Sequence, residues 1–208
     1  MLDVKTLNAF IKKANIAHQQ FCVWLATNNE YAKHQARWNR LQPEIGLFAL
    51  EDFTRKHGCK FKNFWGVVLP TLQHSWVLAT ARLFDPSYNS RDKNKEYPRM
   101  SLDYILSKIT DAQLLNDINE QQKPHQNFIY SIKTQRDNVH AHNDVNFSNT
   151  RIEPGIEELF EWLEITIEKI KKESPDLSNC GVLNVKYNEK ISQCGVDEIF
   201  EALTLSEK

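Results

Sequence analysis

The chain has 208 residues, of which 41% are hydrophobic, so it is long enough to bury one core and carry at most a small appendage. Twenty-six basic and twenty-seven acidic residues leave a formal net charge of -1, which excludes a protein whose overall field attracts nucleic acid. Any contact with RNA must come from a local patch. The first residues lack the basic and apolar regions of a secretory signal, so we expect a cytoplasmic protein.

Hydrophobic residues recur at helical spacing from the beginning of the chain, and the alternation typical of strands is almost absent. We expect an amphipathic helix over residues 4–26. A second helical segment, over residues 30–56, is interrupted by Pro43, because proline cannot donate a backbone hydrogen bond.

A third helix is expected over residues 60–83, ended by Asp85-Pro86. It is apolar on most sides and about as long as a membrane span. Its polar residues, among them His74 and Arg82, would be costly in lipid. We therefore predict a buried central helix and no membrane segment.

The second half of the chain begins with a polar loop, after which Ser101 is expected to cap a short helix. A helix over residues 125–142 follows, and Pro154 opens another one, with acidic residues early and lysines late. The sequence thus predicts an all-α helical bundle over residues 1–173. A C-terminal extension, residues 174–208, has room for a small strand or hairpin at residues 182–185 and a last helix at residues 196–203.

The most informative stretch is Arg136-Asp137-Asn138-Val139-His140-Ala141-His142-Asn143-Asp144. Arginine is a permanent cation with a planar fork of donors that suits a phosphate, and histidine exchanges a proton near neutral pH. A cation and a titratable imidazole within two helical turns are the groups that cleavage of an RNA backbone requires.

Arg136 interrupts an otherwise apolar helical face that includes Ile129 and Ile132. Burying an unpaired guanidinium costs several kcal/mol or more, so this face must meet an acid, a cleft or a partner. The plain alternative to a catalytic role is a salt bridge to Asp137, to Asp144 or to a distant glutamate.

Arg136, Asp137 and the Ala141-His142 pair resemble the signature of the HEPN superfamily, in which an arginine and a histidine are separated by four to six residues. The sequence Leu83-Phe84-Asp85-Pro86 at the end of an apolar helix, together with the later Arg-Asp and Ala-His-Asn-Asp, resembles the AbiU2 type. The resemblance covers about residues 4–172.

This resemblance implies a metal-independent endoribonuclease that acts on RNA as a homodimer, as a toxin or abortive-infection effector, with an antitoxin as a further partner. Arg136 would hold the scissile phosphate, His142 would be the general acid or base, and Asp137 would orient them. Asn143 and Asp144 would support the site.

The six-residue step from Arg136 to His142 leaves the two side chains about 120° apart on an ideal helix. His140 is better aligned with Arg136 and is kept as the alternative or helper. The apolar residues beside Arg136 are expected to lie in a dimer interface.

Metal binding by His140 and His142 is not expected, because a two-residue step on a helix points their rings about 200° apart and no further ligands complete a site. No motif for a cofactor is present, and the four scattered cysteines suit reduced thiols. The second hypothesis is a non-catalytic bundle that binds RNA or dimerises without turnover.

Overall fold

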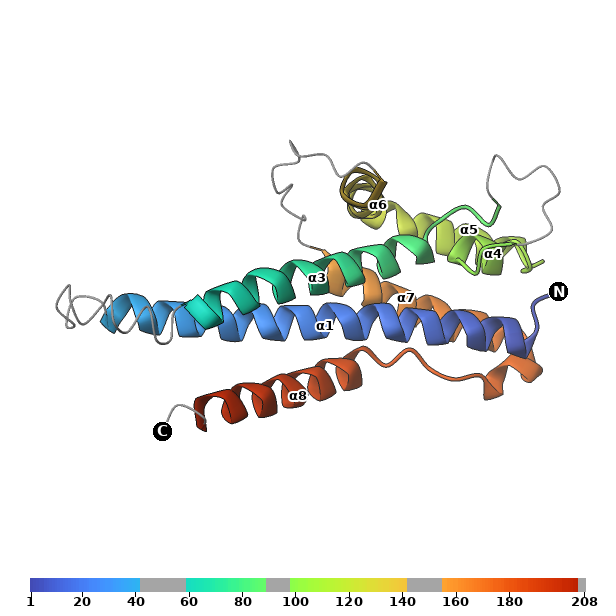
Figure 1. Cartoon of the computed structure of the whole chain (residues 1–208). Coiled ribbons are helices and arrows are strands. Elements are labelled where there is room, and N and C mark those ends of the chain that lie inside the picture. Colours follow the sequence, from blue (N-terminus) through green and yellow to red (C-terminus); the bar gives the residue numbers. More distant parts are fainter. Residues whose placement is uncertain (42–58, 89–97, 142–154, 206–208) are drawn as a thin grey trace. The chain divides into compact units, whose positions relative to one another are not determined.

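The computed structural model describes residues 1–41, 59–88, 98–141 and 155–205, and their side chains except those of residues 34–41, 59–64, 138–141 and 202–205. Within these residues all regular structure is helical and no strand is present (Figure 1). The expectation of an all-α bundle is confirmed. No described helix combines the length and the apolar character that crossing a membrane requires.

The helices follow the expected order, but several of them are longer than the periodicity predicts. They are α1 (Val4–Leu41), α3 (Cys59–Leu83), α4 (Leu102–Leu106), α5 (Ala112–Gln122), α6 (Gln126–Ala141), α7 (Ile156–Lys172) and α8 (Val185–Leu205), with short 3-10 helices at Lys123–His125 and Pro175–Asn179. The helix expected over residues 4–26 thus continues to Leu41. Pro43 and the rest of the second segment, to residue 56, lie outside the described residues.

The chain divides into two compact units, which we describe separately. The first contains residues 1–18 and 77–188, and the second contains residues 19–76 and 189–208. Helices α1, α3 and α8 each contribute residues to both units. The predicted domain boundary between residues 173 and 174 does not coincide with a boundary between these units, because residues 174–188 belong to the first unit.

One stripe of α7 contributes to the core of the first unit and includes Leu159, Leu163 and Ile167, all fully buried. The stripe matches the expected helical periodicity, and Glu157 and Lys172 are among the charges that complement the helix dipole at its two ends. This helix begins directly after Gly155, whose φ of 131° is a conformation that favours glycine.

In the second unit the described core is built around Trp65, which stacks on Phe200 with 5.0 Å between ring centroids and 8° between planes. Ala26 and Val196 are buried in the same cluster. Trp76 is fully buried against Phe21. These tryptophans serve as core residues.

The prediction of a small strand or hairpin at residues 182–185 is wrong. Gly181 donates its N–H to Asn8 Oδ1 at 2.8 Å, and Asn15 Nδ2 donates to the Val182 carbonyl at 2.8 Å. The segment thus bonds to side chains of α1 and not to another strand. Val185 already begins α8, which includes the helix expected at residues 196–203.

Candidate functional site

Arg136 lies on α6, at the edge between the core of the first unit and its surface. Phe128, Ile129 and Ile132 of the same helix are buried. The Arg136 side chain follows them along the helix and is 20% exposed. The apolar residues that the sequence places beside Arg136 therefore pack inside the subunit, which leaves Ile129 and Ile132 without a role in a dimer interface.

Two carboxylates bind the Arg136 guanidinium. Its Nη1 donates to Asp85 Oδ1 at 2.5 Å, and its Nε donates to Asp137 Oδ1 at 2.8 Å. Burial disfavours the charged form, but the hydrogen bonds to Asp137 and Asp85 outweigh this and raise the pKa of Arg136. The salt bridge to Asp137, weighed above as the plain alternative to catalysis, is present.

Asp85 follows the end of α3, two residues after Leu83, and its side chain is largely buried. Its second oxygen, Oδ2, lies 3.6 Å from Nη1 of Arg99, whose side chain is 45% exposed. One carboxylate thus meets two arginines, with the shorter contact to Arg136.

Backbone and side-chain bonds tie the residues after Asp85 to the beginning of α4. Arg99 donates its backbone N–H to the Ser87 carbonyl at 2.6 Å, and Ser87 donates its own N–H to Asp103 Oδ2 at 2.7 Å. Ser101 caps α4 by accepting from the Tyr104 N–H at 3.4 Å, as the sequence predicts. These bonds hold Asp85 and Arg99 on neighbouring segments.

Lys133 precedes Arg136 by three residues on α6 and is half-buried. It makes no hydrogen bond or ion pair with the residues that the structure describes. Burial, together with the charge of Arg136, lowers its pKa, while the carboxylates of Asp85, Asp103 and Asp137 act in the opposite direction. Lys133 was not among the residues singled out from the sequence, although its three-residue spacing from Arg136 was a usable signal.

The remaining predicted site residues cannot be placed at the level of side chains. The backbone of His140 lies in the last turn of α6, but its side chain is outside the described part. His142, Asn143 and Asp144 lie outside the described residues altogether. The choice between His140 and His142 as the acid or base therefore stays a prediction.

The structure brings together two stretches of the motif that are far apart in the sequence. Asp85, from Leu83-Phe84-Asp85-Pro86, and Arg136, from the Arg-Asp stretch, are separated by 51 positions and share a hydrogen bond. The sequence predicted that the face of Arg136 meets an acid, a cleft or a partner, and it did not name Asp85 as that acid. The available signal was an aspartate directly after an apolar helix, where its charge needs a partner.

Among the described residues, no three histidine, cysteine, aspartate or glutamate side chains are grouped closely enough to hold a metal ion. Cys180 and Cys194 are free thiols. Comparisons with protein-family models, curated proteins and solved structures found no match to this chain. The family resemblance therefore rests on the motif residues.

Proposed function

We propose that this chain is a metal-independent endoribonuclease of the HEPN type. The observation that carries the proposal is the Arg136 guanidinium, held by Asp85 and Asp137 at the edge of the core while one fifth of the side chain stays exposed. Two carboxylates fix the direction of the cation before any substrate arrives, and such preorganisation favours stabilisation of a developing charge.

The two hydrogen bonds leave part of the guanidinium available for a phosphate. Arginine has five N–H donors, and the bonds to Asp85 and Asp137 use one on Nη1 and one on Nε. No bond from Nη2 to the described residues competes for the others. Arg136 can therefore keep both carboxylates and still donate to a phosphoryl oxygen.

In the proposed reaction the ribose 2'-hydroxyl attacks the adjacent phosphorus. A base takes the hydroxyl proton, and an acid protonates the 5'-oxygen as the bond between phosphorus and that oxygen breaks. His142 is proposed for this proton transfer, with His140 as the alternative. Arg136 stabilises the phosphoryl oxygens, and the products are a 2',3'-cyclic phosphate and a 5'-hydroxyl.

The test is cleavage of single-stranded RNA by the purified protein in the presence of a chelator. Arg136→Ala and His142→Ala are each expected to lower the cleavage rate by about 10²-fold or more. Arg82→Ala, at an exposed arginine of α3, is the matched control and should cleave like the parent. Cleavage at the parent rate by both motif variants contradicts the catalytic assignment.

A second candidate is a non-catalytic module that binds RNA or dimerises. The double ion pair of Arg136 favours it, because a guanidinium bound by two carboxylates also serves a purely structural purpose. Salt-dependent RNA binding without cleavage by any version of the protein would support this module.

The resemblance further leads us to propose action as a toxin or abortive-infection effector, in a homodimer and under an antitoxin. Slower growth of cells that express the parent chain, restored by Arg136→Ala at equal protein level, would support this role. Equal growth in both cases would count against it.

A further inference from the structure

We propose that Tyr130 and Lys133 of α6 form the track that holds single-stranded RNA beside Arg136, with Lys133 contacting a phosphate and Tyr130 stacking on a base. This inference rests on the proposed function, because it names how the substrate of that site is held. The inference gives Tyr130 and Lys133, which are not part of the Arg-His motif, a role in binding the RNA strand.

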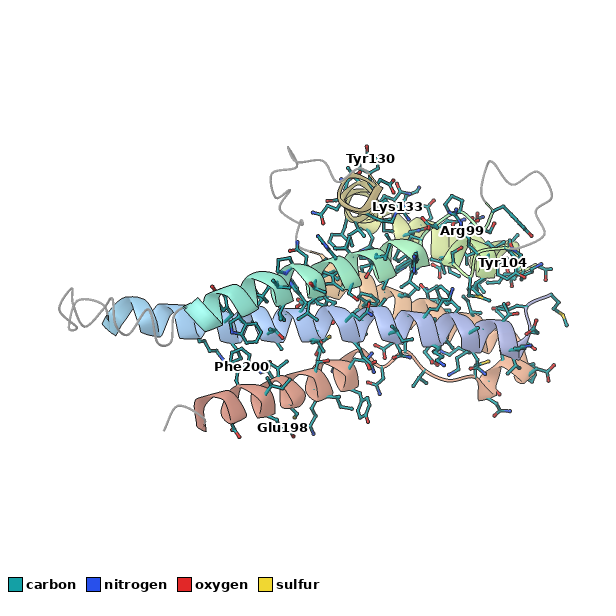
Figure 2. The ribbon with its side chains drawn as sticks, in the orientation of Figure 1. Arg99, Tyr104, Tyr130, Lys133, Glu198 and Phe200 are labelled. Atoms are coloured by element: carbon teal, nitrogen blue, oxygen red, sulfur yellow. The ribbon has the colours of Figure 1, made fainter. Side chains whose placement is uncertain are left out.

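Lys133 lies three positions from Tyr130 and three from Arg136 on α6, so it stands between them, while Tyr130 and Arg136 are about 120° apart around the helix. Residues three positions apart on a helix are neighbours, so Tyr130, Lys133 and Arg136 follow one another along the helix. Figure 2 shows Tyr130 and Lys133 on α6, with Lys133 on the side toward the segment that carries Arg99. Arg136 and Lys133 are both partly buried, whereas Tyr130 is 73% exposed.

Arg136, Arg99 and Lys133 are the cations of this cluster, and the ammonium group of Lys133 has no ion-pair partner among the described residues. Arg136 is bound by Asp85 and Asp137, and Arg99 approaches Asp85. Asp103 accepts the N–H of Ser87. The acids near Lys133 thus have partners, while its three ammonium donors have none among the described residues.

The half-buried position of Lys133 favours a phosphate over water as its partner. Burial and Arg136 lower the pKa of Lys133, and an anion close to its ammonium group would favour the charged form. A phosphate between Lys133 and Arg136 would meet two cations that the helix already holds side by side. The cluster as a whole is close to neutral, so this contact adds local and not long-range attraction.

Tyr130 provides the stacking surface that a single strand uses and a duplex does not. Phe84 and Trp162 of the first unit are buried, whereas Tyr187 of the same unit is exposed on α8 and serves below as the comparison. An exposed aromatic ring beside a lysine combines base stacking with a phosphate contact, which is how sequence-tolerant proteins bind single strands. Because the bases of a duplex already stack on one another, we expect preference for unpaired RNA.

The test is binding of a fluorescent single-stranded RNA oligomer, measured by anisotropy over a range of salt concentrations, with His142→Ala protein so that cleavage does not deplete the probe. Tyr130→Ala is expected to weaken binding about tenfold, and Tyr130→Phe to restore it, because the ring is what stacks. Lys133→Gln is expected to reduce the slope of log K against log salt by about 0.7, the value for one phosphate contact on a single strand. Lys133→Arg should keep the slope.

Matched controls are Tyr187→Ala and Lys190→Gln, at an exposed tyrosine and an exposed lysine of α8. Both should bind like the parent, and the thermal unfolding of every variant is recorded to exclude misfolding. Parent-like affinity and slope in folded Tyr130→Ala and Lys133→Gln overturn the inference.

Measuring cleavage with His142 intact separates the two proposals. If the parent cleaves RNA and the Tyr130 and Lys133 variants bind and cleave as the parent does, this inference fails and the nuclease stands. If the variants lose binding but the parent does not cleave, the inference stands and the nuclease fails. Absence of any RNA binding by the parent overturns both.

Discussion

Asp85 holds the candidate site together through a single carboxylate. It accepts from Arg136 and approaches Arg99, while its own side chain is largely withdrawn from water. In such a position the loss of one partner leaves an uncompensated charge, which costs much more than the loss of an exposed ion pair.

We expect Asp85→Ala to lower the free energy of unfolding by about 2–3 kcal/mol, because the partly buried Arg136 loses its shortest hydrogen bond to a charged partner. Urea unfolding followed by circular dichroism measures this. If the nuclease proposal holds, the same variant should also cleave RNA more slowly, since Arg136 is then held by Asp137 alone.

The control at this scale is Glu120→Ala, which removes the exposed ion pair between Glu120 and Lys123 at the end of α5. Exposed pairs contribute about 0–1 kcal/mol, so this variant should unfold nearly like the parent. Equal destabilisation by the two substitutions would show that the partly buried Asp85–Arg136 pair contributes no more to stability than an exposed ion pair.

At the scale of elements, polar side chains of α1 fasten the segment that leads into α8. Asn15 Oδ1 accepts from Asn188 Nδ2 at 3.0 Å, and Asn188 Nδ2 lies 3.3 Å from Nδ1 of His18. Because the Asn188 amide is the donor, Nδ1 of His18 must accept and therefore carries no proton. Burial lowers the pKa of His18 to about 4, and its ring also packs against Phe160.

The buried, neutral His18 predicts that the protein loses stability in mild acid. The unfolded chain binds a proton on His18 at its ordinary pKa of 6.5, whereas the folded chain binds it only near pH 4. Stability from this group is therefore complete above pH 6.5 and is lost as the pH falls to about 4, by about 3 kcal/mol at most. Urea unfolding at a series of pH values measures it.

Replacing the titrating ring separates His18 from the carboxylates that also titrate in this range. His18→Gln should be less stable than the parent at pH 7, and the difference between the two proteins should shrink as the pH approaches 4. A difference that stays constant over this range would exclude His18 as the source.

At the scale of the whole molecule, the homodimer stays a prediction that follows from the family resemblance. Ile129 and Ile132 do not supply the apolar interface expected beside Arg136, because they lie in the core of their own subunit. Near the site α6 instead carries the half-buried Lys133 and the exposed Asp137 and Tyr130.

We expect light scattering at micromolar concentration to give twice the mass of the chain, since the family resemblance implies a homodimer. If the dimer uses the part of α6 that carries Lys133 and Asp137, it should weaken as salt is raised, because charged groups would then lie in the interface. A single-chain mass at all concentrations and salt levels would contradict the dimer and would restrict the proposed site to one subunit.

The sequence by itself determined the features that depend on neighbours along the chain. Helical periodicity predicted the all-α fold and the apolar stripe of α7, and Ser101 predicted the beginning of α4. It also determined that Arg136 must meet an acid, a cleft or a partner, because an unpaired charge on an apolar helix face is costly to bury.

Only the tertiary structure decided which distant groups meet. Asp85 becomes the partner of Arg136 through the packing of the α3 end near α6, and no local pattern encodes a pairing across 51 positions. Likewise, the short apolar run at residues 182–185 reads equally well as a strand or as a connecting segment. The amides of Asn8 and Asn15 decide it, because they bind the backbone groups that a strand would have to pair.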